Sequence, residues 1–426
     1  MKKIIASASL AALGVAGVQA AYAPGLSPQE KSKAWTISGT LRGFYDDNPT
    51  ASIKADKQES WGLELSPSLA VNLALDQTLI GFNYTYDMRY YEARPQHEAD
   101  HSHHVSFKIN HVITERYKVE VSDVLNYAQE AELSQGIVSN PTGTLRTEQS
   151  YLHNLGRLAF TAELTPILGV VAEYQNDYWD YDQTGNGSLS ALLDRVEHLG
   201  TITARWQAMP NTVGLLSYSY GVIDHTSDDS LLPLPVGVPP LPPLAETRDS
   251  HSHFVSVGAE QNFTSQLTGK ARIGAQFTDY PNARPTQDDS VTSPYADASA
   301  SWTYNPGSYL QLGIRHQRNP TDVGIGTAGT TPVQDQESTG IYGVVNHRIG
   351  PNFTGSLLGQ FQHSSYRGGG LDGKIDTLGL IGVNFAYQVN EFITAEAGYN
   401  YDRLDSDLAG RSYTRNRVYF GLRASY

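Results

Sequence analysis

The sequence predicts an all-β fold: a transmembrane antiparallel up-and-down β-barrel of about 18 strands, with short periplasmic turns and long extracellular loops. Apolar and polar residues alternate with a period of two, the pattern of a strand between an apolar phase and water. Tight turns alternate with long polar connections along the chain. In the last segment of the chain, Val418, Phe420 and Leu422 fall on one face, and Arg417 and Arg423 fall on the other.

The strands are expected from residue 35 onward. The first spans 35–45, and the run 61–75 turns at Asp76-Gln77 into a strand over 78–90. Proline, glycine and asparagine suit tight reversals, so further short turns are predicted at such residues. These turns are expected near Glu115, Pro166, Pro210-Asn211, Ser265-Gln266, Pro306-Gly307, Pro351-Asn352 and Asn390.

Longer connections separate these hairpins. They are expected at about 47–57, 93–101, 129–147, 182–193, 225–249, 281–290, 320–335, 367–374 and 405–411. An even number of strands leaves both termini on the side of the short turns. A β-propeller would repeat in fours with a blade motif, and stacked sandwiches have no reason to sort loop lengths by parity. The barrel is therefore favoured over both.

The N-terminus indicates export. Lys2 and Lys3 precede an apolar run over 4–18, and Val18-Gln19-Ala20 offers small residues for a signal peptidase. Residues 1–20 are therefore predicted to be a signal peptide, 21–34 a short periplasmic leader, and 35–426 a single transmembrane barrel domain. The predicted location is the outer membrane of a Gram-negative bacterium.

Composition excludes several classes. Cysteine is absent, so no disulfide framework supports an exported chain of this length. The mean hydropathy of -0.37 fits a soluble protein, but the alternating strands of a membrane barrel give the same average. The period of the apolar residues must therefore distinguish the two classes. The formal net charge of -14 argues against nucleic-acid binding, which needs a basic surface. We predict no nucleic-acid partner.

The terminal segment, which ends on Tyr426, resembles the signal strand of bacterial outer-membrane barrels. This resemblance implies that the barrel-assembly machinery is a partner and that the barrel contacts outer-membrane lipid. Hairpin pairs such as 255–260 and 271–276 make nearly the whole mature chain similar to the family called putative β-barrel porin 2. The resemblance implies a diffusion channel, or a barrel serving exopolysaccharide export. It supplies no catalytic residue, cofactor or metal, and no enzymatic activity is predicted.

The polar faces of the strands supply candidate pore-lining residues. Basic candidates are Arg42, Arg89, Lys108, Arg157, Arg205, Lys270, Arg272, Arg315, Arg417 and Arg423. Acidic candidates are Glu64, Glu163, Glu173, Glu260, Asp297 and Glu396. Such a wall contains more basic than acidic residues, and rings of Arg and Lys select for anions in pores. The alternative is that these charges form ion pairs that only solvate the interior of the barrel.

Aromatic residues are expected at the two membrane interfaces. Trp302, Tyr304, Phe353, Phe392 and Tyr426 are predicted on the periplasmic side, and Tyr399 and Tyr401 approach the extracellular loops. A further outer girdle is predicted from Tyr86, Tyr174, Trp179, Tyr218, Tyr220 and Tyr280.

Two segments allow more than one interpretation. His97, His101, His103 and His104 are predicted to share a loop over 97–104, where a solvated loop is favoured over a transition-metal site. The proline-rich stretch 231–244 favours polyproline II and could fold inward as a constriction or stand outward.

The function predicted is passive diffusion of small polar solutes, with a weak preference for anions. The alternatives are a specialised barrel that exports an anionic exopolysaccharide, and a structural or adhesive barrel whose loops are the working surface. An outer-membrane lipase or protease is disfavoured because no Gly-x-Ser-x-Gly elbow or other nucleophile context occurs.

Overall fold

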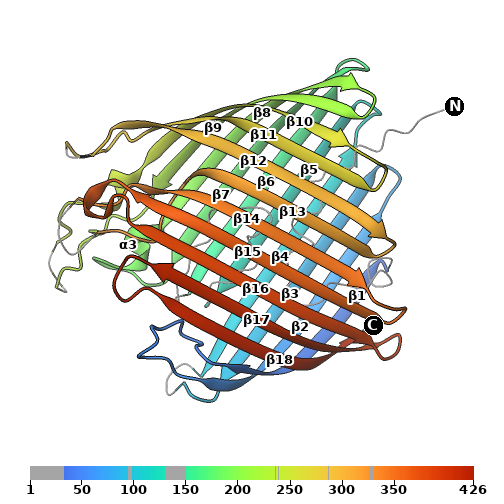
Figure 1. Ribbon diagram of the computed structural model, residues 1–426, viewed down its shortest axis with the longest axis horizontal. Helices are drawn as coiled ribbons and strands as arrows, with labels where there is room; N and C mark the ends of the chain where they lie inside the picture. Colours follow the sequence, from blue (N-terminus) through green and yellow to red (C-terminus); the bar gives the residue numbers. More distant parts are fainter. Residues whose placement is uncertain are drawn as a thin grey trace.

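The chain forms a closed antiparallel barrel of 18 strands (Figure 1). Each strand pairs with its neighbours in sequence, and β1 also pairs with β18, which closes the sheet. This computed structural model describes residues 33–94, 98–129, 150–235, 237, 239–285, 287–325 and 331–426. The predicted fold class and strand number are confirmed. Because a closed sheet has no free edge, every strand can satisfy its backbone groups within the barrel.

The strands are 12 to 16 residues long. They are β1 (Trp35–Asp46), β2 (Ser60–Ala74), β3 (Thr78–Tyr91), β4 (Ala99–Val112), β5 (Tyr117–Ala128), β6 (Tyr151–Glu163), β7 (Leu168–Tyr181), β8 (Arg195–Met209), β9 (Thr212–His225), β10 (Ser250–Asn262), β11 (Leu267–Asp279), β12 (Ser290–Asn305), β13 (Ser308–Asn319), β14 (Asp335–Arg348), β15 (Phe353–Arg367), β16 (Ile375–Gln388), β17 (Ile393–Ser406) and β18 (Tyr413–Ser425). Among the described residues, the loops contain the short helices α3 (Leu189–Leu193), η2 (Ala245–Arg248) and η3 (Gly369–Leu371). In the ranges described, no helix is long and apolar enough to cross a membrane.

Connection lengths sort by parity, as the sequence predicts. The turns between β2 and β3, β8 and β9, and β12 and β13 contain two or three residues, and they lie at the end that holds the C-terminus (right in Figure 1). The opposite end carries the long connections, including α3. The barrel therefore has a turn side and a loop side with different chemistry.

The two faces of each strand meet different surroundings. In β18, Val418, Phe420 and Leu422 point outward, and Phe420 has 64 % of its surface exposed. Tyr419 and Arg415 on the same strand are buried inside the barrel. The alternation predicted for this segment is present in the folded chain, because successive side chains of a strand point to opposite faces.

The interior is unevenly filled. An apolar cluster lines the inner wall from β14 to β18, and Ala51 of the loop between β1 and β2 packs against it. The cluster contains Tyr342, Val344, Leu358, Leu378, Leu380, Leu404 and Tyr413. Polar side chains of β1 to β13 face the remaining interior, so the inner wall has an apolar sector and a charged sector.

Three expectations are wrong. Trp179 lies on the inner face of β7, where its ring stacks on His153 with centroids 3.7 Å apart, and does not belong to the outer girdle. Tyr280 is also not in the girdle, because it is buried beneath the loops and donates a hydrogen bond to Asp335. Residues 99–104 are not a loop, because β4 begins at Ala99.

The histidines of this segment are divided between the two faces of β4. His101 and His103 lie outward beside Tyr86 and Tyr84, whereas His104 is buried inside with Nδ1 2.8 Å from Asn126 Oδ1. His97 falls outside the described residues. Within the described ranges, no three His, Asp or Glu residues are grouped so that they could hold a metal ion.

The proline-rich connection forms no strand over the residues that are described. An isolated bridge between Ser230 and Leu244 closes its base, and the amide of Leu231 donates to the carbonyl of Pro243 at 2.9 Å. Leu231 is buried whereas Leu241 is exposed.

Candidate functional site

The charged sector of the inner wall begins on β1, where Arg42 binds two carboxylates. Arg42 lies opposite Glu64 of β2 in the strand register and forms an ion pair with it. Its Nε and Nη2 also donate to Glu396 Oε2 of β17, at 3.0 and 2.8 Å. Glu64 lies in register with Arg89 of β3 and accepts from its Nε at 3.0 Å. Four charges from four strands are therefore neutralised along the wall.

A glycine lets Arg42 reach across an intervening strand. Gly421 of β18 stands in register with both Arg42 and Glu396. A Cβ added at Gly421 would lie 2.5 Å from Cγ of Arg42, closer than real Cβ atoms approach other heavy atoms. The absent side chain therefore leaves the path that the guanidinium occupies.

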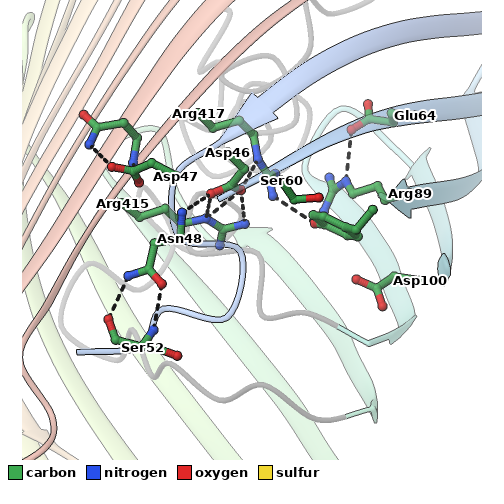
Figure 2. A network of polar contacts seen from close by, with 12 residues as sticks. Asp46, Asp47, Asn48, Ser52, Ser60, Glu64, Arg89, Asp100, Arg415 and Arg417 are labelled. Atoms are coloured by element: carbon green, nitrogen blue, oxygen red, sulfur yellow. Dashed lines mark hydrogen bonds and ion pairs between the residues drawn. The ribbon is translucent and has the colours of Figure 1, made fainter. Parts of the chain in front are cut away.

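A second buried network joins the first and last strands at the loop side (Figure 2). Asp46 is fully buried and accepts from Nε and Nη2 of Arg415 and from Nε of Arg417, at 2.6 to 3.1 Å. Arg417 also donates to the hydroxyl of Tyr91 at 3.1 Å. The side chain of Asn48 donates to the backbone carbonyl of Thr414 at 3.0 Å. The loop that follows β1 is thereby attached to β18.

The opposite part of the wall has more basic than acidic groups. Arg205 of β8 donates to both oxygens of Glu260 on β10, at 3.1 and 2.7 Å, and Lys270 of β11 lies 3.6 Å from the same carboxylate. Arg315 of β13 pairs with Asp297 of β12 at 2.6 Å.

Arg272 lies in this basic sector without a carboxylate of its own. It is in register with Gly258 on one side and with Asp297 on the other. Its Nε is buried and has no hydrogen-bond partner among the described residues. Four basic side chains, Arg205, Lys270, Arg272 and Arg315, thus share the two carboxylates of Glu260 and Asp297, and we call this group the basic sector.

The remaining predicted pore residues are spread around the barrel. Arg157 and Glu173 pair with each other on the inner faces of β6 and β7. Lys108 lies on the inner face of β4, and the described residues include no ion pair to it. Glu163 is exposed at the turn end of β6. Arg423 donates to Ser38 Oγ at 3.3 Å on the inner face between β18 and β1.

The predicted interface aromatics lie at the two ends of the barrel. On the turn side, Phe392 and Tyr426 stack with ring centroids 6.4 Å apart. Trp302 packs on Tyr304, whose hydroxyl lies 2.9 Å from Nδ1 of His347. On the loop side, Tyr399 is exposed and donates to Asn416 at 2.7 Å. Tyr401 lies on the same face of β17 as Tyr399.

Sequence reasoning missed two features of the inner wall. Neither Asp46 nor Arg415 is among the predicted pore residues, yet the two form a buried ion pair at the loop side. The apolar sector was missed because Leu378, Leu380 and Ile381 make both faces of β16 apolar, so the alternation there gives no signal.

The long loops on the loop side are tied to one another. Arg248 of η2, with 1 % of its surface exposed, donates to the carbonyls of Leu192 and Thr321, both at 2.6 Å. Burial, assisted by the charge of Arg195, lowers the pKa of Arg248 to about 10. Arg248 therefore remains cationic at neutral pH while it joins three connections.

Replacing Arg248 with glutamine is expected to loosen this loop assembly. Two hydrogen bonds from a charged donor are lost, and each contributes roughly 1.5–3 kcal/mol. We expect cleavage of loops 226–249 and 320–334 by proteinase K to accelerate at least about tenfold, because proteolysis follows the population of the open form. Lys374→Gln, an exposed loop substitution, is the matched control. Equal cleavage of both variants would contradict the role given to Arg248.

The family of the chain follows from a comparison with protein-family models. The model described as Putative beta-barrel porin 2 matches residues 35–426, which include every strand of the barrel. The chain belongs to this family. It is therefore a porin-type barrel of the Gram-negative outer membrane and a channel for small solutes, and family and fold are those of channels rather than enzymes.

Similar barrels occur among solved structures. The outer membrane protein OpdK from Pseudomonas aeruginosa has 12 % sequence identity and a TM-score of 0.46, over 92 % of this chain and 99 % of OpdK. A BenF-like porin from Pseudomonas fluorescens Pf-5 has 11 % identity and a TM-score of 0.46, over 92 % and 99 %. Pseudomonas aeruginosa OccK2 (OpdF), solved with glucuronate, has 11 % identity and a TM-score of 0.47, over 92 % and 98 %. None of the curated proteins matches the chain.

Proposed function

We propose that this channel passes small polar solutes with a weak preference for anions. The observation that carries the proposal is the basic sector, in which four cationic side chains share two carboxylates. Elsewhere on the wall the acids and bases are closer to balance, as in the group formed by Arg42, Arg89, Glu64 and Glu396. An excess of positive charge on one sector raises the local concentration of anions.

Two arrangements within the basic sector support a site for passing anions. The guanidinium of Arg272 forms no ion pair with a carboxylate among the described residues. Lys270 keeps a loose contact with Glu260, because the two charged groups are 3.6 Å apart. Donors that are not saturated by protein carboxylates remain able to bind a carboxylate or phosphate transiently. Transient binding is what conduction requires, since a tightly held ion would not leave.

Removing these two charges is expected to weaken anion preference. A unit charge about 10 Å from the solute path contributes about 0.4 kcal/mol in water, which is roughly a twofold change in partition. Each lost charge lowers the partition of chloride and raises that of potassium by this factor, so Lys270→Gln with Arg272→Gln should lower the chloride-to-potassium permeability ratio about sixteenfold at low ionic strength. Reversal potentials of the barrel in planar bilayers, measured across a potassium chloride gradient, give this ratio.

The control removes a charge that lies outside the pore. Arg403 points outward near the loop side and pairs with the exposed Asp405, so Arg403→Gln should leave the permeability ratio unchanged. A cation-selective wild-type channel, or equal ratios for the double variant and the wild type, would reject the anion preference.

The same preparation separates the rival functions. Swelling of liposomes in small neutral sugars is expected for a diffusion channel. A barrel that exports an anionic exopolysaccharide should stay closed to these sugars, and a structural or adhesive barrel should leave the liposomes sealed. The basic sector would suit an anionic polymer as well as a small anion, so swelling is the measurement that separates these two hypotheses.

A further inference from the structure

The outward wall of the barrel carries a hollow of about 400 Å³ across β6, β7, β8 and β9. Its lining is almost entirely apolar and includes Leu158, Phe160, Ala172 and Ile202. Leu158, Phe160 and Ile202 are among the exposed apolar side chains of the outer surface. The hollow therefore opens toward the membrane and not toward the pore.

The loop-side part of the hollow exists because Gly200 has no side chain. Gly200 of β8 is in register with Tyr174 of β7 and with Tyr220 of β9, so two tyrosines flank a position that has no side chain. An added Cβ at Gly200 would meet nothing within 4 Å. Tyr174 and Tyr218 line this part, which is a slot with aromatic walls.

Histidines lie directly beyond the slot on the loop side. Nδ1 of His198 is 2.7 Å from the hydroxyl of Tyr174 and accepts from Nδ2 of Asn176 at 3.2 Å. In the neutral ring the proton then lies on Nε2, because Nδ1 is an acceptor. On β10, Nδ1 of His253 is similarly placed 2.8 Å from the hydroxyl of Tyr218.

The heights of these residues place His198 near the outer membrane interface. One residue of a strand tilted by about 40° rises about 2.5 Å along the membrane normal. Tyr174 lies six residues from the turn-side end of β7, and His198 stands in register with Asn176, eight residues from that end. The tyrosine is therefore about 15 Å and the histidine about 20 Å above the turn side. Since the apolar band is about 25 Å tall, the histidine lies within about 5 Å of its loop-side edge, where its ring can reach a headgroup phosphate.

We propose that this hollow binds one phosphorylated lipid of the outer leaflet. An acyl chain lies in the slot over Gly200, and the phosphate accepts a hydrogen bond from Nε2 of His198. The tyrosine contacts hold the ring in place and fix which nitrogen faces the headgroup. This site is on the outside of the barrel and is independent of anion selectivity in the pore.

A lipid explains the hollow better than a second copy of the chain. The surface around it belongs to the face that contacts the membrane, so hydrocarbon is the phase already present there. The slot also ends at polar N–H donors within reach of the headgroups, which complements a chain with a phosphate at its end. A protein partner would need a protruding apolar side chain followed by an acceptor at the same spacing.

The test measures lipids retained by the detergent-purified barrel in native mass spectrometry. The probes are phosphatidylglycerol and a glycosyl diacylglycerol that has the same acyl chains and no phosphate. The wild type should retain one phosphatidylglycerol at least about tenfold better, because a hydrogen bond to a charged group is involved. His198→Ala should abolish this preference, and Gly200→Leu should lower retention of both lipids about tenfold, because the slot is filled.

The control for the filled slot is Gly43→Leu on the opposite wall. Gly43 also points outward with nothing within 4 Å of an added Cβ, and it stands between the exposed Leu63 and Phe420. This variant should bind lipid like the wild type. Equal loss in both glycine variants, or unchanged preference in His198→Ala, would overturn the proposal. So would a wild-type dimer that Gly200→Leu dissociates. Unaltered channel conductance of Gly200→Leu establishes that the variant is folded.

Discussion

Replacing Asp46 with alanine is expected to destabilise the barrel by roughly 3–5 kcal/mol, the cost of removing one partner from a buried ion pair. Arg415 and Arg417 would both lose the carboxylate to which they donate. Both guanidinium groups lie in the interior, where water replaces the lost partner poorly. The substitution also removes the acceptor for the amide of Asn48, which starts the loop after β1.

The measurement is urea unfolding of the barrel folded in lipid vesicles, monitored by tryptophan fluorescence. Asp405→Ala is the control, because Asp405 and Arg403 form an ion pair in which each side chain is more than half exposed. Exposed pairs contribute at most about 1 kcal/mol, so the control should shift the midpoint little. A loss of less than about 1 kcal/mol in Asp46→Ala would show that water enters this network.

The effect should be concentrated where the barrel closes. Asp46 is the last residue of β1 and stands in register with Arg417 of β18, so the network lies on the joint between the first and last strands. In the combined variant Asp46→Ala with Arg415→Met, the uncompensated charge is partly removed. We expect it to recover part of the stability lost in the single variant.

The period of two made the barrel predictable. In β1 and β18 each side chain meets either the outer surface or the interior, so apolar and polar residues alternate, apart from the inward Phe44. Short turns were located because Pro210-Asn211 and Pro306-Gly307 provide the residues that tight reversals need. Both signals are local, and a single sequence contains them.

The alternation fails where both faces of a strand meet the same kind of surroundings. Residues 99–104 are polar on both faces because β4 continues beyond the apolar band, and this makes a strand look like a loop. Tyr178 and Trp179 are aromatic neighbours, so composition does not tell which one faces outward. In β16 the alternation fails for the opposite reason: Ile381 faces outward and Leu380 faces inward, so the strand is apolar on both faces.

The arrangement of the inner charges depends on register between strands. Arg42 and Glu396 are far apart in sequence, and only the closure of β1 on β18, with Gly421 between them, brings them together. The list of charged residues could therefore be predicted, but the division into balanced groups and a basic sector could not. The same limit explains why Arg272 could not be distinguished from the paired arginines by its sequence.

Replacing Leu312 with arginine should destabilise the barrel by about 2–4 kcal/mol, because the new charge would face hydrocarbon near the middle of the membrane. Leu312 is half exposed on the outer face of β13 and lies four residues from the turn-side end of that strand. This spacing corresponds to about 10 Å within an apolar band of about 25 Å. The comparison is urea unfolding in vesicles against the wild type.

The neighbouring residue provides the decisive control, because it carries the same change to the other face. Gln311 points inward, in register with Ser301 and Val344. Gln311→Arg should cost less than Leu312→Arg, because an arginine there can reach the polar wall beside Ser301, whereas one at Leu312 meets hydrocarbon. The difference between two adjacent positions measures the contrast between lipid and water directly. If both variants lose the same stability, the outward face of β13 does not meet hydrocarbon at this height.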